Sequence, residues 1–137
     1  MNYRNRARTR GATAALLLAG TMALSGCGSA DEPPAPVPLD ALVGQSVAQT
    51  QARLAGPATM VSYDLSKPVT GAKARYGTGK GAGTDEDWVV VAACGNTKNL
   101  EDDTRLAVGV LHQDAYSKDI EHKAKKHAFN RYLKECG

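Results

Sequence analysis

The sequence predicts an α+β domain in which one helix packs on a three-stranded antiparallel sheet and an additional helix follows at the C-terminus. Three observations predict this fold class. They are a helix-start signature at residues 46–49, two runs of β-branched residues at 87–94 and 105–111, and a charged C-terminal segment with apolar residues at four-residue steps. The 137 residues of the chain allow one modest domain.

The first helix is predicted over residues 47–55. Ser46 is followed three residues later by Gln49, so the two side chains can cap each other's backbone N–H groups in a capping box. Gly56 and Pro57 then favour a helix end, because glycine adopts the left-handed conformation common at helix ends and proline cannot continue a helix.

The first and third strands are predicted at residues 58–65 and 105–111. Met60 and Val61 form the apolar body of the first strand. The third strand is a run of apolar residues that follows a polar turn region, residues 95–104, as is typical of a strand in a small sheet.

The second strand, at residues 87–94, carries the strongest strand signal in the chain. Its continuous apolar and β-branched run indicates a strand that is buried on both faces. Trp88 is the only tryptophan of the chain, and we expect it to anchor the core rather than to stack on a ligand.

A glycine-rich stretch between the first two strands is the candidate binding segment. Residues 66–87 are predicted to form a long mobile loop or a β-ribbon, and within it loop 71–83 carries the basic candidates Lys73, Arg75 and Lys80. A phosphate-binding loop is a further alternative that the sequence disfavours, because Lys80 is followed by glycine where that motif requires serine or threonine. The two remaining interpretations are a solvated basic loop and a loop that contacts an anionic polymer.

A C-terminal helix is predicted from about Asp119 to the end of the chain. Its apolar stripe consists of residues at four-residue steps, joined by two further apolar residues, namely Ile120, Ala124, Ala128, Tyr132 and Cys136 with Phe129 and Leu133. The basic residues on the remaining surface predict an ordinary solvated face. The alternative is attraction to anionic lipid headgroups or wall polymers.

The first 26 residues have the order of a secretory signal peptide. A basic segment with four arginines precedes a short apolar run, residues 11–24, which is shorter than a typical transmembrane helix. The run ends in Leu24-Ser25-Gly26-Cys27, which resembles the lipobox of bacterial lipoproteins. By that resemblance, cleavage precedes Cys27, and lipid on Cys27 anchors the chain at the extracytoplasmic face of the cell membrane. The alternatives are an uncleaved anchor or a plain secretory signal.

Residues 27–38 are predicted to be a tether between the lipidated cysteine and a folded domain at 39–137. Its closely spaced prolines favour an extended polyproline conformation. The signal peptide carries 4 of the 17 basic residues and none of the 14 acidic ones, so its removal changes the formal net charge from +3 to 13 − 14 = −1. The basic balance therefore belongs to the signal peptide and does not indicate a nucleic-acid partner.

The chain has three cysteines, and lipidation of Cys27 leaves Cys94 and Cys136 as a pair. An even number of cysteines in an oxidising compartment predicts one disulfide. The alternatives are two free thiols or a metal site, and the spacing of the cysteines matches no zinc pattern. We predict no metal and no cofactor.

The start of the domain resembles that of a PASTA domain. The residues that carry the resemblance are Val43-Gly44-Gln45-Ser46-Val47 and Leu54-Ala55-Gly56, which follow the proline-rich tether. A tryptophan-containing strand with a cysteine, and a second cysteine near the C-terminus, are similar to PASTA-like variants of exported actinobacterial proteins. The resemblance covers roughly residues 36–111 and implies one helix covered by three antiparallel strands. It also implies recognition of cell-wall fragments, and it transfers no ligand residue.

The sequence predicts a non-catalytic protein. His122 and His127 are five residues apart, so on a helix they would not form the i, i+4 pair of a zinc protease. We therefore expect a binding module whose partner is peptidoglycan or a cell-envelope protein. The alternative is a small extracytoplasmic enzyme or enzyme accessory that uses loop 71–83 as a mobile lid.

Overall fold

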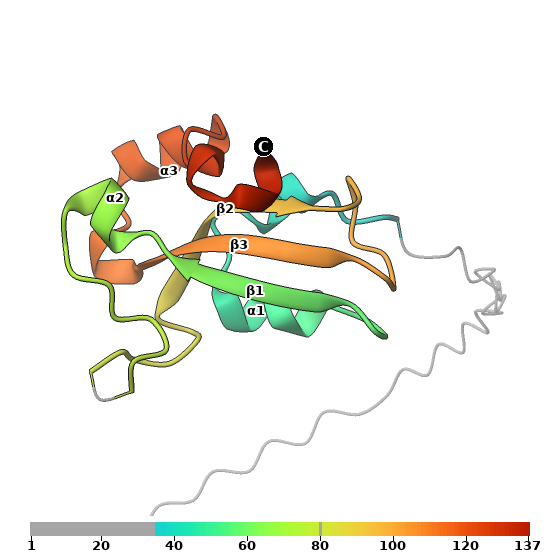
Figure 1. The fold of residues 1–137 in the computed structure, drawn as a ribbon, viewed down its shortest axis with the longest axis horizontal. Helices are drawn as coiled ribbons and strands as arrows, with labels where there is room; N and C mark the ends of the chain where they lie inside the picture. Colours follow the sequence, from blue (N-terminus) through green and yellow to red (C-terminus); the bar gives the residue numbers. More distant parts are fainter. Residues whose placement is uncertain (1–34, 80) are drawn as a thin grey trace, which may run out of the picture. The chain divides into compact units, whose positions relative to one another are not determined.

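The computed structural model describes residues 35–79 and 81–137 of the chain. The predicted signal peptide, Cys27 with its lipobox, and Lys80 lie outside the described residues. The described part holds a three-stranded sheet and three α-helices (Figure 1). None of these helices is long and apolar enough to cross a membrane.

The elements follow one another in a simple order, with η marking a 3-10 helix. They are η1 (Leu39–Leu42), α1 (Val47–Arg53), β1 (Thr59–Asp64), α2 (Ser66–Thr70), β2 (Trp88–Gly95), β3 (Arg105–His112), η2 (Gln113–Ala115), α3 (Lys118–Lys125), η3 (Asn130–Tyr132) and η4 (Lys134–Cys136). The helix α1 packs on one face of the sheet, and α3 with the C-terminal turns packs on the other (Figure 1).

The sheet is mixed, so the prediction of three antiparallel strands is wrong. The strand order is β1-β3-β2, with β2 antiparallel to β3 and β1 parallel to β3. The chain reverses direction between β1 and β2 and again between β2 and β3, so β3 runs in the same direction as β1. Because β3 inserts between the other two strands, β1 has a parallel neighbour.

The outer edge of β2 is already occupied, which explains why β1 lies on the far side of β3. The N–H of Gly44 donates to the carbonyl of Val90 at 2.8 Å, and the N–H of Val90 donates to the carbonyl of Gln45 at 2.8 Å. The segment before α1 therefore acts as a short additional edge on β2, and the free side of β3 remains for β1.

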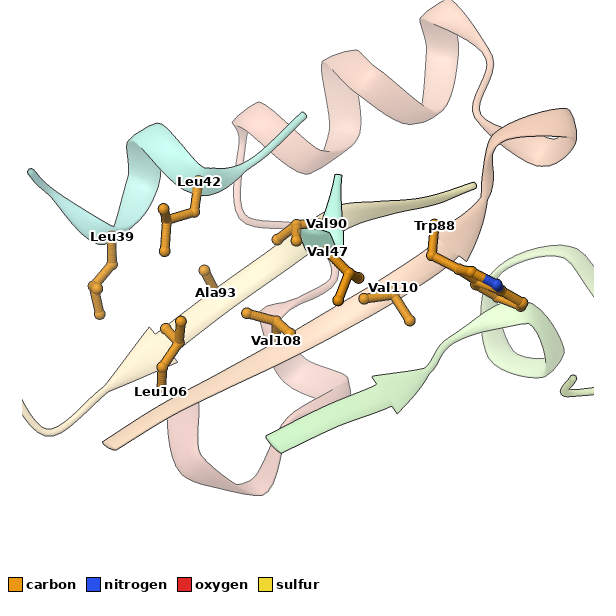
Figure 2. Packing of buried hydrophobic residues seen from close by; sticks show 9 residues of the cluster. All are labelled: Leu39, Leu42, Val47, Trp88, Val90, Ala93, Leu106, Val108 and Val110. Atoms are coloured by element: carbon orange, nitrogen blue, oxygen red, sulfur yellow. The ribbon is translucent and has the colours of Figure 1, made fainter. Parts of the chain in front are cut away.

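One hydrophobic cluster lies between the sheet and the N-terminal elements (Figure 2). It consists of Leu39, Leu42, Val47, Trp88, Val90, Ala93, Leu106, Val108 and Val110. The even-numbered residues of β3 supply three of its members, as expected when alternate side chains of a strand point to one face.

A second cluster lies between the opposite face and the C-terminal elements. Its buried members are Leu65, Val91, Ala92, Leu111, Ala124, Phe129 and Leu133. A bulge in β2 between Val90 and Ala92 shifts the alternation of side chains, so Val90 and Ala93 both point into the first cluster. The prediction that this strand is buried on both faces is confirmed.

The helix α1 begins as predicted. The hydroxyl of Ser46 accepts the N–H of Gln49 at 3.1 Å, and the side chain of Gln49 accepts the N–H of Ser46 at 3.0 Å, which completes the capping box. The helix ends at Arg53, slightly before the predicted end. Val47 and Thr50 are fully buried and form the face that packs on the sheet.

Val61 does not belong to the apolar body of β1, contrary to the prediction. It is 54% exposed, whereas Met60 packs against the first cluster. Adjacent side chains of a strand point to opposite faces. On the second face, the C-terminal elements cover Tyr63 but leave Val61 in solvent.

The C-terminal helix is shorter than predicted, because α3 ends at Lys125. The N–H of His127 donates to the carbonyl of Ala124 at 2.9 Å, and the N–H of Ala128 donates to the carbonyl of Lys123 at 3.1 Å. This pair of bonds is a Schellman motif, which closes a helix with one residue in the left-handed conformation. His127 takes that conformation, with φ at 57°.

The predicted apolar stripe is kept except at Ala128, which is exposed. Ala124, Phe129 and Leu133 are buried in the second cluster, and Ile120, Tyr132 and Cys136 pack against it. After Lys125 the short 3-10 helices η3 and η4, rather than one continuous helix, bring the later residues to this face.

Cys94 and Cys136 lie at disulfide distance, as the sequence predicts. Their Cα atoms are 5.4 Å apart across a sequence separation of 42 residues. The pair connects the end of β2 to the final turn of the chain, and both cysteines pack against the second cluster.

Candidate functional site

The glycine-rich stretch after β1 is held at its base by one carboxylate. Asp64 Oδ2 accepts the N–H of Arg75 at 2.6 Å and the N–H of Tyr76 at 2.8 Å, while Oδ1 accepts the N–H of Ser66 at 2.8 Å. Burial opposes the charge on Asp64, but the hydrogen bonds outweigh it and lower the pKa of this carboxyl group. Asp64 therefore joins the start of α2 to the first limb of the loop.

This stretch differs from the predicted long mobile loop or β-ribbon. It begins with α2, which covers Ser66–Thr70 and ends at Gly71 in the left-handed conformation. The rest is a series of turns that includes Gly77 and Gly79, with φ values of 70° and 91°. A Cβ at either glycine would meet nothing within 4 Å, so the backbone conformation rather than lack of space favours glycine here.

Trp88 holds the opposite limb of the loop. Its side chain is 1% exposed, and its indole N–H donates to the carbonyl of Ala82. The ring meets Tyr76 edge-on at a centroid distance of 5.1 Å and His112 at 5.3 Å. The prediction that Trp88 anchors the core is confirmed, and the same ring also organises the loop.

Acidic residues connect the loop to α1. The hydroxyl of Tyr76 donates to Asp85 Oδ1 at 3.1 Å, and the amide of Gln51 donates to Asp85 Oδ2 at 3.1 Å. Burial, together with the hydrogen bond to Asp85, raises the pKa of the Tyr76 hydroxyl. Asp87 accepts the N–H of Thr84 at 2.7 Å, which lowers the pKa of Asp87.

These contacts enclose a solvent-open hollow of about 470 Å³, which we call the loop hollow. It is lined by Tyr76, Gly77, Gly79, Ala82, Gly83, Thr84, Asp85 and Trp88. Its volume lies in the range of small-ligand sites, and its wall combines aromatic rings, a carboxylate, a hydroxyl and glycine backbone. Such a wall can pack on an apolar surface and hydrogen-bond to hydroxyl or amide groups.

Of the basic candidates, the two that the structure describes, Lys73 and Arg75, do not line the loop hollow. Lys73 and Arg75 are exposed on the first limb of the loop, and neither forms an ion pair with another described residue. Arg75 directly precedes Tyr76, so its side chain starts at the rim. Lys80 belongs to the same loop but lies outside the described residues.

Tyr76 and Asp85, which combine an aromatic wall with a carboxylate, are not among the site residues predicted from the sequence. Tyr76 is an aromatic residue within a glycine-rich stretch, and that contrast was an available signal. Asp85 lies in an acidic turn before a strand, and such turns are usually only solvated, so its role depends on contacts that the folded chain creates.

A second hollow, of about 520 Å³, borders the cysteine pair. Cys94 and Cys136 contribute to its wall together with residues of η1 and of the turn 97–99. Near it, the hydroxyl of Tyr63 donates to Glu135 at 2.6 Å, which raises the pKa of Tyr63 and lowers that of Glu135. The cysteines are therefore accessible to small molecules from this side.

None of the three histidines lines the loop hollow, although His112 contacts the ring of Trp88. His112 lies 3.2 Å from Asp114, and His127 lies 3.7 Å from Asp40. Within residues 35–79 and 81–137, no three His, Cys, Asp or Glu side chains are grouped to hold a metal ion.

Comparison of the chain with protein-family models, with curated proteins and with solved structures finds no match. The resemblance to PASTA domains therefore stays a prediction.

Proposed function

We propose that this chain is a non-catalytic binding module, attached by lipid on Cys27 to the extracytoplasmic face of a membrane, and that it binds fragments of peptidoglycan. The observation that carries the proposal is the loop hollow, with Tyr76 and Asp85 in its wall and two basic side chains beside it. The chemistry of this wall fits a ligand that is part sugar and part acidic peptide.

The sugar part would bind in the hollow. Sugar rings present hydroxyl and amide groups around an apolar face, and the hollow offers Thr84, Asp85 and glycine backbone groups beside the Tyr76 ring. Aromatic side chains with a polar atom suit ligands of this mixed character.

The peptide part would extend towards the basic rim. Stem peptides of peptidoglycan carry carboxylates, and Lys73 and Arg75 are exposed without a described ion-pair partner. Hydrogen bonds between such cations and carboxylates are stronger than those between neutral groups. Binding should therefore weaken as salt concentration rises.

The membrane part of the proposal rests on the sequence of the first 38 residues. The signal-like segment ends in a lipobox-like motif at Cys27, and the proline-rich tether could hold the domain roughly 30 Å from the lipid surface at about 3.1 Å per residue. That reach would place the domain beside the wall polymer. Metabolic labelling with a fatty-acid analogue tests the anchor, since a Cys27→Ala variant should take up no label.

The ligand is tested by co-sedimentation of residues 28–137 with insoluble peptidoglycan at low and high salt. This segment retains every described element and both hydrophobic clusters. We expect retention that falls with salt, a loss of affinity of about three- to tenfold in Lys73→Ala/Arg75→Ala, and a larger loss in Tyr76→Ala. Lys118→Ala/Lys126→Ala, which removes the same charge from α3 and its C-cap, is the matched control and should bind normally.

Absence of retention by a folded wild-type domain would overturn the wall-binding proposal. Equal losses in the two double variants would mean that net charge, rather than the loop, holds the polymer. Circular dichroism of Tyr76→Ala separates a lost contact from a lost fold, because only an unfolded variant would lose its strand signal.

A further inference from the structure

The outer edge of β1 is open. The N–H of Thr59 donates to the carbonyl of Thr104 at 2.9 Å, and the N–H of Leu65 donates to the carbonyl of Val110 at 3.0 Å, so the odd-numbered residues of β1 face β3. In a parallel pair the even-numbered residues then direct their N–H and C=O groups to the other side. In the described part of the chain β1 is an edge strand with β3 as its one neighbour in the sheet, and no backbone hydrogen bond from outside the sheet reaches Met60 or Ser62.

This edge lacks the features that usually prevent strand pairing. β1 contains no proline and no lysine, and its register with β3 is continuous from Thr59 to Asp64 without a bulge. The outer edge of β2, by contrast, is occupied by residues 44–46. The two edges of the sheet therefore differ, and the edge at β1 is available to another strand.

The side chains along β1 give this edge an apolar surface. Val61 is 54% exposed and shares a face of the strand with Tyr63, whose hydroxyl bonds to Glu135. Exposure of a β-branched residue in the middle of an edge strand has a cost that pairing with a second strand would remove.

We propose that β1 pairs antiparallel with β1 of a second copy of this chain, about a two-fold axis at Ser62. The two three-stranded sheets then form one continuous sheet. With the axis at Ser62, each outward residue finds a hydrogen-bonding partner: Ser62 meets Ser62, and Met60 meets Asp64 of the second copy. An axis at Val61 would leave Asp64 outside the paired segment, whereas the axis at Ser62 pairs every outward-facing residue of β1.

The same register is favourable for the side chains. Val61 lies opposite Tyr63 of the second copy in a close, non-hydrogen-bonded pair, and an aromatic residue beside a β-branched one is a stabilising cross-strand pair. The two-fold axis produces this pair twice. The exposed valine of each copy is thereby covered.

Charge also favours a second copy over an unrelated strand. Arg105 lies beside Thr59 at the start of β1, and Glu135 lies at Tyr63 near its end. Antiparallel pairing moves the basic end of one copy towards the acidic end of the other, so the surface is complementary to itself. A single strand-to-strand contact is small, and we expect a weak dimer with a dissociation constant on the order of 100 µM.

Sedimentation equilibrium of residues 28–137 over a wide concentration range tests the dimer. Val61→Lys should raise the dissociation constant at least tenfold, because it places a charge in the pair with Tyr63, and Val61 is exposed enough that the fold should tolerate lysine. Ala41→Lys adds the same charge on η1, away from β1, and should dimerise like the wild type.

Thiol crosslinking tests the register. A Ser62→Cys variant should be joined by a short bis-maleimide, because the axis places residue 62 next to itself, at about 5.5 Å between Cα atoms. A Thr59→Cys variant on the same strand should not, since its two copies would lie about 20 Å apart at 3.4 Å per residue. A monomer at all concentrations, a dimer insensitive to Val61→Lys, or equal crosslinking at both positions would overturn the proposal.

Discussion

Leu65 packs directly on the backbone of Gly109, the residue of β3 that lies opposite Tyr63 and Ala92. A Cβ built on Gly109 would lie 3.0 Å from Leu65 Cγ and 3.3 Å from the Cβ of Ala92, and Leu65 Cδ1 would lie closer still. The central strand β3 therefore needs glycine at this position for space. Leu65, which directly precedes α2, packs on the sheet at that point.

Replacement of Gly109 by alanine should destabilise the domain by about 1–3 kcal/mol, because an additional methyl group overpacks a closed site. Urea unfolding followed by tryptophan fluorescence measures the change. A second substitution, Leu65→Ala, provides the control. Leu65→Ala should lower the free energy of unfolding less in the Gly109→Ala background than in the wild type, because it removes the Leu65 atoms that clash with the added methyl group. Simple additivity of the two costs would contradict this packing.

Loss of the cysteine pair should cost up to about 4 kcal/mol, the value that chain entropy gives for a closed loop of 42 residues. We expect the double variant Cys94→Ser/Cys136→Ser to unfold at clearly lower urea, and wild-type protein in reductant to behave like the variant. The mass of the native domain should be two hydrogens lower than that of the reduced domain. Equal stability with and without reductant would show that the thiols are free.

The substitution His127→Gly should stabilise the domain by about 1 kcal/mol, because His127 is held at a φ of 57°, where an L side chain is strained. His127→Ala is the matched control. It removes the same imidazole and its contact with Asp40 but keeps the strain, so it should give no gain. A stabilisation of equal size in both variants would assign the effect to the imidazole instead.

The carboxylate of Asp64 should make stability depend on pH in a defined direction. The pKa of Asp64 is lowered in the folded state from an ordinary value of 3.8. The contribution of Asp64 to the free energy of unfolding is therefore complete above pH 3.8, and it is lost as the pH falls through the pKa of the folded state. Asp64→Asn should cost roughly 1–3 kcal/mol at neutral pH. The difference between wild type and variant in urea unfolding should shrink below pH 3.8. A difference that stays constant down to pH 2 would contradict this account.

Local signals in the sequence identified the parts of the fold that depend on neighbouring residues. The capping box at Ser46 and Gln49 predicted the start of α1, and the run of apolar residues after Asp87 predicted a strand buried on both faces. Both signals lie within a few residues of the structure that they specify. The cysteine pair was also predicted, because parity and compartment restricted the possible partners.

The partner of each strand could not be predicted in the same way. Two antiparallel reversals leave β3 free to lie on either side of β2, and the choice depends on the hydrogen bonds of Gly44 and Gln45 to Val90. The end of α3 was missed because histidine rather than glycine takes the left-handed position. The loop hollow depends on Asp64 binding the backbone of Arg75 and Tyr76, a contact across eleven residues or more that no local pattern shows.

The central position of β3 has a consequence for how the domain folds. β1 and β2 both precede β3 along the chain, yet each forms its ladder with β3 alone. Until residues 105–112 have been synthesised and released, β1 has no strand partner and β2 has only the short edge formed by residues 44–46. The three-stranded sheet must therefore assemble late, through pairings between distant residues that make folding slow. A chain interrupted before β3 would leave β1 unpaired and one edge of β2 open, a form prone to aggregation.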